Sequence, residues 1–214
     1  TIDLRGPLTI TGIAGKTTLV SASGAPIFHI GGAEPVVLQG LGFDGAGKGK
    51  EDPLILAEDA TDLTITACRF TATPDDALRL ERCAGLILAN RFEKIGRSAV
   101  FTRDGKGLTI ADNTITRIGN NGIQVWTSEP TECGTIVANN RISHVDYTDG
   151  GTGQNGNGII IFRAGRVIVE ANRISDCAFS GVRNNSGAGI HIVNNNIIRM
   201  GEVAIYCEFA YEGA

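Results

Sequence analysis

Three residues near the C-terminal end of the chain, Arg183, Tyr206 and Glu208, carry side chains suited to acid–base chemistry. An arginine can neutralise the carboxylate of a uronate while a neighbouring tyrosine moves the proton at C5, which is lyase or epimerase chemistry. Glycoside hydrolysis would instead need two carboxylates roughly 5 to 10 Å apart, and Glu208 has no evident acidic partner. We predict these three residues as catalytic candidates and leave open whether the protein is an enzyme.

A second set of residues has the composition of a carbohydrate-binding surface. Aromatic rings stack on sugar faces, and amide, guanidinium and carboxylate groups bond to hydroxyls. The predicted substrate-binding residues are Phe101, Arg103, Gln124, Trp126, Phe162 and Asn185. Three other interpretations of the same residues remain open, namely contacts that only stabilise a sheet, a surface for a protein partner, and a surface covered by a loop.

These residues are positioned by a repeat. The phrases LTITACRF, GLILANRF, LTIADNTI, TIVANNRI, VIVEANRI and IHIVNNNI follow one another along the chain. Their sixth positions are Cys68, Asn90, Asn113, Asn140, Asn172 and Asn195, so the intervals are 22, 23, 27, 32 and 23 residues. A period of this size with occasional insertions indicates a solenoid.

Two solenoids fit the phrase, because LTIADNTI also satisfies the core pattern of a leucine-rich repeat. A leucine-rich repeat needs a helical or 3₁₀ segment after that core, whereas TRIGNNGIQVW and SDCAFSGVRN are rich in residues that disfavour helix. Isoleucine and valine alternate with a period of two. The sequence therefore predicts an all-β fold, a right-handed parallel β-helix with about eight coils of three strands each, forming a single domain over residues 1–214.

Asparagine, glycine and cysteine are assigned to the architecture. An inward asparagine at each corner between the second and third strands can bond to the coils above and below it. Glycine, at 29 residues of 214, is expected to provide positive φ at corners, and Gly122, Gly158 and Gly181 are expected to form the bends before the first strand. The five cysteines include no CxxC pair and are interpreted as buried free thiols, which leaves the redox compartment open.

The alternation of strand residues then defines the outward surface of the first strand of each coil. One outward column is predicted as Ile55, Arg79, Phe101, Gln124, Ile160, Arg183 and Tyr206, and the other as Ala57, Glu81, Arg103, Trp126, Phe162, Asn185 and Glu208. In the second column we expect an ion pair between Glu81 and Arg103 and a cation–π contact between Arg103 and Trp126. We predict an exposed groove along this face.

Two insertions are predicted as loops at the rim of that groove. They are TSEPTEC at 127–133 and DYTDGGTGQNGN at 146–157. Asp146 and Asp149 could bind calcium, although their spacing differs from that of a defined calcium loop, and a solvated turn is the preferred interpretation. Asp75 and Asp76 are also interpreted as turn residues, because adjacent side chains on extended chain point apart.

Composition excludes several classes of protein. The formal net charge is −4, and the 19 basic residues are spread along the chain, so we expect no electrostatic footprint for nucleic acid or anionic lipid. No apolar run approaches the length of a membrane span. His29, His144 and His191 fall on different faces of the predicted helix, so no metal site or cofactor is predicted.

The repeats resemble those of the pectin-lyase-like parallel β-helix superfamily. More narrowly, residues 119–126, 151–185 and 201–214 resemble a bacterial group of twin-arginine-translocated β-helix repeat proteins. The resemblance implies export across the inner membrane, a periplasmic or secreted location, and a chain that is a fragment of a longer protein. It implies no particular activity, and no match to the signatures of pectate lyases, polygalacturonases or alginate epimerases is found.

Two functional hypotheses follow. The first is an exported protein that binds an acidic or neutral polysaccharide along the first-strand face. If the protein is an enzyme, it also modifies that polysaccharide. The second is a non-catalytic envelope scaffold whose same face docks a protein. In either case a solenoid end with unpaired strand edges is expected to favour association between copies.

Overall fold

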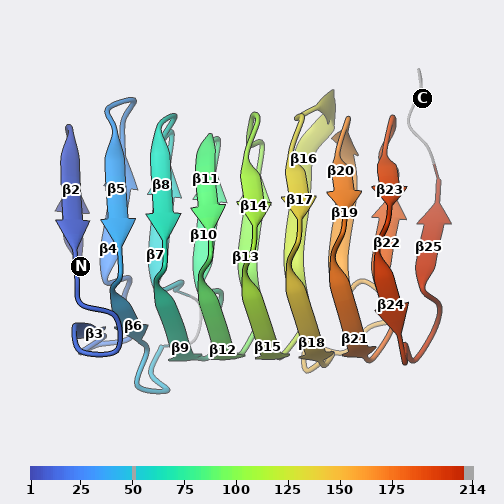
Figure 1. Ribbon diagram of the computed structural model, residues 1–214, viewed down its shortest axis with the longest axis horizontal. Coiled ribbons are helices and arrows are strands. Elements are labelled where there is room, and N and C mark those ends of the chain that lie inside the picture. The colour runs from blue at the N-terminus through green and yellow to red at the C-terminus, as the bar shows by residue number, and fades with distance from the viewer. Residues whose placement is uncertain (50–51, 210–214) are drawn as a thin grey trace.

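The computed structural model describes residues 1–49 and 52–209, and these residues form a parallel β-helix with three sheets (Figure 1). The chain passes through the sheets in turn, so strands that are neighbours in a sheet come from successive coils. Right-handed crossovers are the rule for parallel strands, and the three-sheet solenoid is of this right-handed type. The predicted all-β fold is confirmed, and the leucine-rich repeat is excluded for the described residues because none of them is helical.

Sheet A contains nine strands, which is one more than the predicted number of coils. They are β1 (Ile2–Leu4), β4 (Phe28–Gly31), β7 (Ile55–Glu58), β10 (Leu78–Glu81), β13 (Ser98–Arg103), β16 (Asn121–Glu132), β19 (Asn157–Gly165), β22 (Val182–Asn185) and β25 (Ile205–Glu208).

Sheets B and C contain eight strands each. Sheet B consists of β2 (Leu8–Thr11), β5 (Val36–Gln39), β8 (Leu63–Thr66), β11 (Gly85–Leu88), β14 (Thr109–Ala111), β17 (Ile136–Ala138), β20 (Ile168–Glu170) and β23 (His191–Val193). Sheet C consists of β3 (Thr18–Val20), β6 (Gly42–Asp44), β9 (Arg69–Thr73), β12 (Arg91–Ile95), β15 (Thr114–Ile118), β18 (Arg141–Val145), β21 (Arg173–Cys177) and β24 (Asn196–Ile198).

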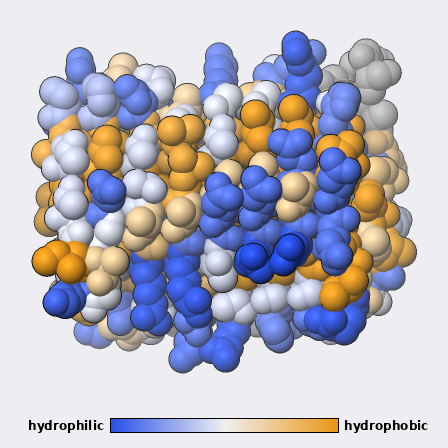
Figure 2. Space-filling model, in the orientation of Figure 1, coloured by the Kyte–Doolittle hydropathy of each residue, from blue (hydrophilic) through white to orange (hydrophobic). Residues whose placement is uncertain are grey.

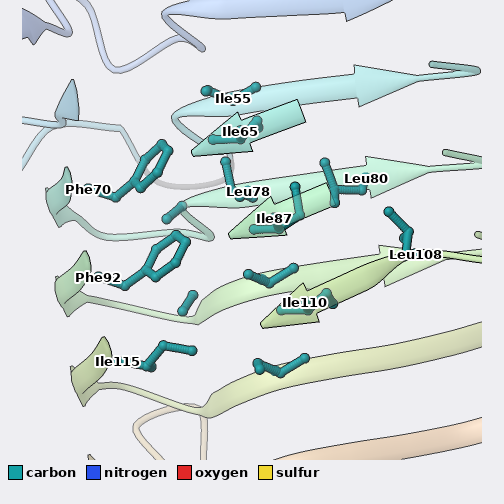
Figure 3. Packing of buried hydrophobic residues seen from close by; sticks show 14 of the residues in the cluster. Ile55, Ile65, Phe70, Leu78, Leu80, Ile87, Phe92, Leu108, Ile110 and Ile115 are labelled. Atoms are coloured by element: carbon teal, nitrogen blue, oxygen red, sulfur yellow. The ribbon is translucent and has the colours of Figure 1, made fainter. Parts of the chain in front are cut away.

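The core is a set of stacks in which each coil repeats the side chain of its neighbour (Figure 3). Phe70 stacks on Phe43 and on Phe92 with ring centroids 4.9 Å apart in both cases. Ile65 and Ile87 are register partners in sheet B and are fully buried. Alternation between inward apolar and outward polar residues is therefore sufficient to build the core, as the period of two predicts.

The asparagine ladder forms as predicted at the corner between sheets B and C. The Oδ1 atom of Asn113 accepts from the backbone N–H of Asn90 at 2.9 Å, and its Nδ2 donates to the carbonyl of Ile87 at 2.9 Å. The same pattern recurs at Asn140 and Asn172, and Cys68 joins it through its backbone N–H. Each bond satisfies a backbone group that the bend would leave unpaired, a contribution of about 1 kcal/mol per bond.

The predicted role of glycine at the corners is confirmed only in part: Gly107 and Gly134, which precede strands of sheet B, do have positive φ. Positive φ at the corner before each ladder residue is adopted by non-glycine residues such as Ala89 and Asp112. Gly122, Gly158 and Gly181 lack positive φ, and each would place a Cβ against the next coil, for example 2.4 Å from the carbonyl oxygen of Gly158 at Gly122. These glycines are required because successive coils approach closely there.

The cysteines agree largely with the prediction. Cys68, Cys83, Cys133 and Cys177 are buried free thiols, and Cys207 is exposed. Among the described residues, no helix has the length and apolarity that crossing a bilayer requires.

Candidate functional site

The strands of sheet A pair in the predicted register from β10 to β25. The first outward column is Arg79, Phe101, Gln124, Ile160, Arg183 and Tyr206, and the second is Glu81, Arg103, Trp126, Phe162, Asn185 and Glu208. We refer to these two columns together as the sheet A face. All nine predicted catalytic and substrate-binding residues therefore lie on one face.

The register at β7 differs from the prediction by one residue. Leu56 and Glu58, rather than Ile55 and Ala57, align with Arg79 and Glu81. Ile55 and Ala57 are fully buried. The apolar run Leu54 to Leu56 gives no alternation, so the sequence could not decide which of its residues faces outward.

Aromatic rings form a continuous stack across three coils of the sheet A face. The Phe101 and Trp126 ring centroids lie 5.5 Å apart with an interplanar angle of 70°, and those of Trp126 and Phe162 lie 5.1 Å apart at 51°. The guanidinium of Arg163 lies over the Phe162 ring at 5.0 Å. These three rings are half-buried, so each presents part of its surface to solvent. The stack is the main apolar feature of the face.

Arg103 does not make the predicted cation–π contact with Trp126. Within the described residues, the cation–π contacts are Arg163 with Phe162 and Arg183 with Tyr206. Arg103 turns instead toward Glu81 and donates from Nε to its Oε2 at 2.9 Å, which confirms the predicted ion pair. A carboxylate one coil away is a stronger partner for a guanidinium than a ring edge.

Arg183 occupies the centre of the C-terminal part of the face. Its Nε donates to Oε1 of Glu208 at 2.7 Å, and its guanidinium carbon lies 4.6 Å from the centroid of the Tyr206 ring. Asn185 donates to the same Glu208 oxygen at 2.9 Å, and Glu202 approaches Arg183 at 3.8 Å. The expected stacking of Arg183 on Tyr206 is thus present, and Glu202 is a neighbouring carboxylate that the sequence did not reveal.

The sheet A face is less exposed than predicted. Gln124 and Arg183 each expose 8% of their surface, and Ile160 exposes 4%. Residues 146–156 fold over this part of the column, and Gly153 lies so close to the Arg183 guanidinium that no Cβ would fit. The accessible surface is therefore the aromatic stack together with Arg103, Asn185, Tyr206 and Glu208.

The two insertions flank the face from opposite ends of its strands, which confirms that both lie at its rim. Residues 127–132, predicted as a loop, continue β16 beyond an irregularity between Trp126 and Thr131. Ser128 at that end donates its N–H to Asp104 at 2.7 Å. At the other end, Asn121 donates its side-chain amide to the carbonyl of Gln154 at 3.1 Å.

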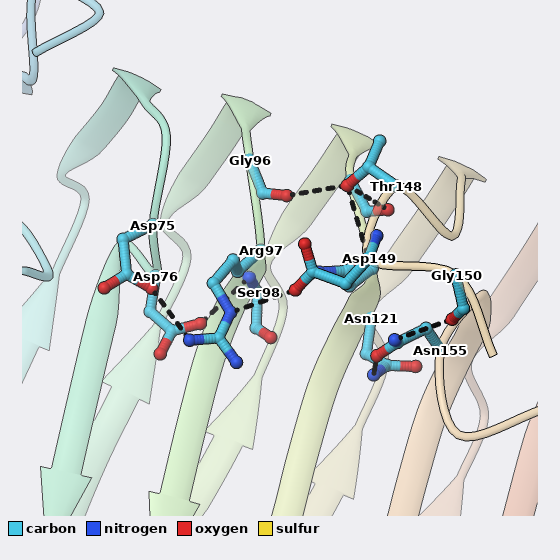
Figure 4. Close-up of polar contacts among 12 residues, drawn as sticks. Asp75, Asp76, Gly96, Arg97, Ser98, Asn121, Thr148, Asp149, Gly150 and Asn155 are labelled. Carbon is cyan, nitrogen blue, oxygen red and sulfur yellow. Dashed lines mark hydrogen bonds and ion pairs between the residues drawn. The ribbon is translucent and has the colours of Figure 1, made fainter. Parts of the chain in front are cut away.

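A polar network before β10 was not predicted (Figure 4). Asp75 and Asp76 are buried, and both accept hydrogen bonds from Nη2 of Arg79, at 3.1 and 2.9 Å. Arg97 lies 3.5 Å from Asp75 and 3.4 Å from Asp149, so the network reaches the 146–156 segment. The expectation that the two aspartates point apart is wrong, because the turn brings both carboxylates to one guanidinium.

Burial governs the ionisation of this network. Burial raises the pKa of Asp76, and the adjacent carboxylate of Asp75 raises it further, while the Arg79 guanidinium acts in the opposite direction. No motif in the sequence signals this arrangement, since only the fold shows that the turn is buried.

The carboxylates of Asp146 and Asp149 have separate partners. Asp149 accepts from the amide of Asn120 at 2.6 Å, whereas Asp146 accepts from the backbone N–H of Tyr147 at 2.9 Å. Calcium binding by this pair stays a prediction.

Comparison with known proteins gives a family but little detail. A search of curated proteins found no match. Among solved structures, a polygalacturonase from Erwinia carotovora has 9% identity and a TM-score of 0.49, with 94% of this chain and 85% of that chain covered. The catalytic domain of an α-1,3-glucanase in complex with tetrasaccharides has 12% identity and a TM-score of 0.41, covering 99% of this chain and 62% of that one.

The family match is more extensive. The family model described as periplasmic copper-binding protein (NosD) matches residues 11–206. This range begins at the end of β2 and ends within β25. The repeated β-helix coils are what this match spans, in agreement with the superfamily resemblance. The chain therefore belongs to the NosD family of periplasmic proteins.

Proposed function

We propose that this protein is an exported, periplasmic polysaccharide-binding β-helix whose binding site is the sheet A face. The observation that carries the proposal is the stack of Phe101, Trp126 and Phe162 across three coils, with ring centroids 5.1 to 5.5 Å apart. Stacked, half-exposed rings beside a few fixed polar groups are the usual composition of a site for an amphipathic ligand such as a sugar.

Charge pairing favours a neutral polysaccharide over an acidic one on this face. Arg79 is held by Asp75 and Asp76, Arg103 by Glu81, and Arg183 by Glu208. A uronate would have to displace one of these internal carboxylates, whereas a neutral sugar can accept and donate hydrogen bonds without breaking the pairs. The ligand class supported here is a neutral glycan.

A further prediction is that Arg183, Tyr206 and Glu208 chemically modify the bound glycan. For lyase or epimerase chemistry Arg183 would have to leave Glu208, to which it is bound through Nε and Nη2. We therefore place binding first and treat catalysis as a prediction that product analysis of incubated glycans checks.

The copper binding in the family's description does not fit the residues of this chain. Copper sites use neutral histidine, thiolate or thioether ligands placed together. Within residues 1–49 and 52–209, no three His, Cys, Asp or Glu residues are placed to hold a metal ion. His29 already contacts Asp3 through one ring nitrogen, at 3.0 Å, and Glu58 through the other, at 2.9 Å.

The thiols are no better suited to copper. Burial raises the pKa of the Cys83 thiol to about 11 and that of Cys177 to about 12, so the thiolates that a metal requires are disfavoured. No step of the proposed function involves copper.

The test is a screen of the protein against a panel of neutral and acidic glycans, followed by titration of the best ligand. Trp126→Ala should weaken binding about 30-fold, as expected for a central aromatic anchor, and Trp126→Phe should retain most of it. Tyr147→Ala removes an exposed aromatic outside the stack and is the matched control. Absence of binding across the panel, or equal losses in the Trp126 and Tyr147 variants, would contradict the proposal.

A further inference from the structure

The outer face of sheet C carries charged residues in two rows that run along the solenoid axis. We call the row at the start of the strands row one and the row near their ends row two. Row one is Arg69, Arg91, Thr114, Arg141 and Arg173, which pair in register from coil to coil. Row two is Lys94, Arg117, His144, Asp176 and Arg199, which all have positive φ.

Row one places like charges beside each other. Arg69 is the register partner of Arg91, and Arg141 is that of Arg173. Neighbouring strands lie about 4.8 Å apart, and like charges directly opposite each other in a sheet are destabilising. An anionic ligand that lies across the arginines would remove this cost.

The carboxylates near row one do not balance its charge. Glu93 is shared by three arginines, at 3.5 Å from Arg69, 3.4 Å from Arg91 and 2.8 Å from Arg117. In the described part of the chain, the side chains of Arg141 and Arg173 have no ion pair or hydrogen bond. The five strands β9, β12, β15, β18 and β21 together contain six arginine or lysine residues and only two acidic ones.

We expect no electrostatic footprint for nucleic acid or anionic lipid, and that stays a prediction, yet basic side chains do gather on the outer face of sheet C. The basic residues are spread evenly along the sequence, but spacing at the coil period stacks them in one place. Figure 2 shows hydrophilic residues predominating along the lower edge of the molecule, where the strands of sheet C lie in Figure 1. An acidic protein thus presents one strongly basic face.

Row two exists because strands β12, β15, β18 and β21 each contain a local irregularity. Glu93 pairs with Thr116 and Ile95 with Ile118, so Lys94 is left out of the ladder and turns outward. Lys94 is exposed and has no ion pair among the described residues, whereas Arg199 is bound to Asp176 at 2.6 Å. Beyond this row lies a groove of about 890 Å³, whose basic, acidic and histidine lining residues are Lys94, Arg117, His144, Asp146, Asp176 and Arg199.

Between the two rows lies a floor of small hydroxyl residues. Thr116, Ser143 and Ser175 face outward on successive coils, and Ser143 donates to Thr116 at 3.1 Å. Toward the N-terminus the same column continues with Glu93, which the nearby arginines neutralise, and then with Thr71. Three residues along a strand separate the rows, which is roughly 10 Å. The arginines of row one and the mainly basic row two, on either side of this floor, make a channel parallel to the solenoid axis.

We propose that this channel binds a linear anionic polysaccharide, with sugar hydroxyls on the floor and carboxylate or sulfate groups on the arginines. The planar fork of arginine suits both kinds of anion. Single-stranded nucleic acid is disfavoured because the rings of β9 and β12, Phe70 and Phe92, point into the core and leave no stacking platform outside. A bilayer is disfavoured because its flat surface would contact the ends of the long side chains in the two rows but not the short side chains between them.

The test titrates the protein with alginate, dextran sulfate and uncharged dextran. Alginate or dextran sulfate should bind, with an affinity that falls steeply as salt rises, and dextran should not bind at this face. The stronger of the two polyanions identifies the anion as carboxylate or sulfate. The double variant Arg141→Gln, Arg173→Gln should lose about tenfold in affinity for that polyanion, since each cation near an anionic surface contributes a few-fold.

Controls separate this site from the sheet A face and from a structural role. Trp126 lies on sheet A, so Trp126→Ala should leave polyanion binding to sheet C unchanged. The two proposed sites can therefore be tested independently of each other. The double variant should unfold at the same temperature as the wild type or at a higher one, because it removes a like-charge contact. A destabilised double variant, an unchanged affinity, or tighter binding of single-stranded DNA or anionic vesicles than of either polyanion would overturn the proposal.

Discussion

Sheets A and C both stack arginines at the repeat of the coil, but they surround them differently. On sheet A, Arg103 has Glu81 on the preceding coil, and Arg183 has Glu208 on the following one. On sheet C, Arg141 has Arg173 as its register partner. The backbone geometry is the same, so the difference lies in the sign of the neighbouring charge.

This difference shows how a parallel solenoid distributes charge. Every side chain has register partners about 4.8 Å away in the coils above and below it. A charged column is therefore stabilised either by alternation of sign within the protein or by an external counter-ion. Sheet A follows the first course and suits neutral ligands, whereas sheet C is built for the second.

Among variants that test this difference between the two sheets, Arg79→Gln on sheet A should have the largest effect on stability. The substitution leaves Asp75 and Asp76 buried side by side without their guanidinium. Breaking such a buried group should lower the free energy of unfolding by about 3 kcal/mol, measured by urea denaturation at pH 7.

Two checks accompany this variant. Arg173→Gln, the equivalent change on sheet C, should leave the free energy of unfolding unchanged or slightly higher. The deficit of Arg79→Gln should shrink as pH falls, since burial already raises the pKa of Asp76 and protonation removes the unpaired charge. Equal deficits in the two variants would show that sheets A and C do not differ in this respect.

The fold could be predicted because the repeat states it many times. Ile65, Ile87 and Ile110 recur at one position of successive coils, and Asn90, Asn113 and Asn140 recur at another, so each coil independently predicts the same fold. The predicted register was wrong only where the local sequence is ambiguous, as in the apolar run from Leu54 to Leu56.

The site could be predicted only in part, because its properties depend on contacts between coils and on the inserted segments. The register placed Trp126 beside Phe162, but it could not show that residues 146–156 cover Arg183. Nor could it show that Asp75 and Asp76 share one guanidinium. Part of the 201–214 segment used for the family resemblance, residues 210–214, lies outside the described residues.

A smaller effect would convert sheet C to the pattern of sheet A. Thr114 lies between Arg91 and Arg141 in row one. Thr114→Glu would place a carboxylate between two cations and should raise the free energy of unfolding by about 0.5 kcal/mol, which thermal or urea denaturation can resolve. It should also weaken binding of alginate or dextran sulfate.

The matched control for that change is Thr114→Gln, because glutamine has nearly the same size as glutamate and carries no charge. It should leave both stability and polyanion binding close to those of the wild type. If the Glu and Gln variants behave alike, the charge of row one is not what distinguishes the two sheets.

The smallest effect concerns the one ion pair within row two, between Asp176 and Arg199. The Arg199 guanidinium holds the pKa of Asp176 below its usual range, and His144 acts in the same direction. A carboxylate with a lowered folded-state pKa contributes stability above the unfolded-state value near 4, and this contribution is lost as pH falls through the folded-state pKa. Arg199 is exposed and Asp176 is partly exposed, so solvent screens the pair and Asp176→Asn should lower Tm by only about 1 °C at pH 7. The difference in Tm between variant and wild type should vanish in the acid range, because there the wild-type carboxyl is also uncharged.

A Tm difference that persists at low pH would mean that Asp176 acts through packing of the loop corner rather than through its charge. Row two would then lack the internal charge pairing that distinguishes it from the unpaired arginines of row one.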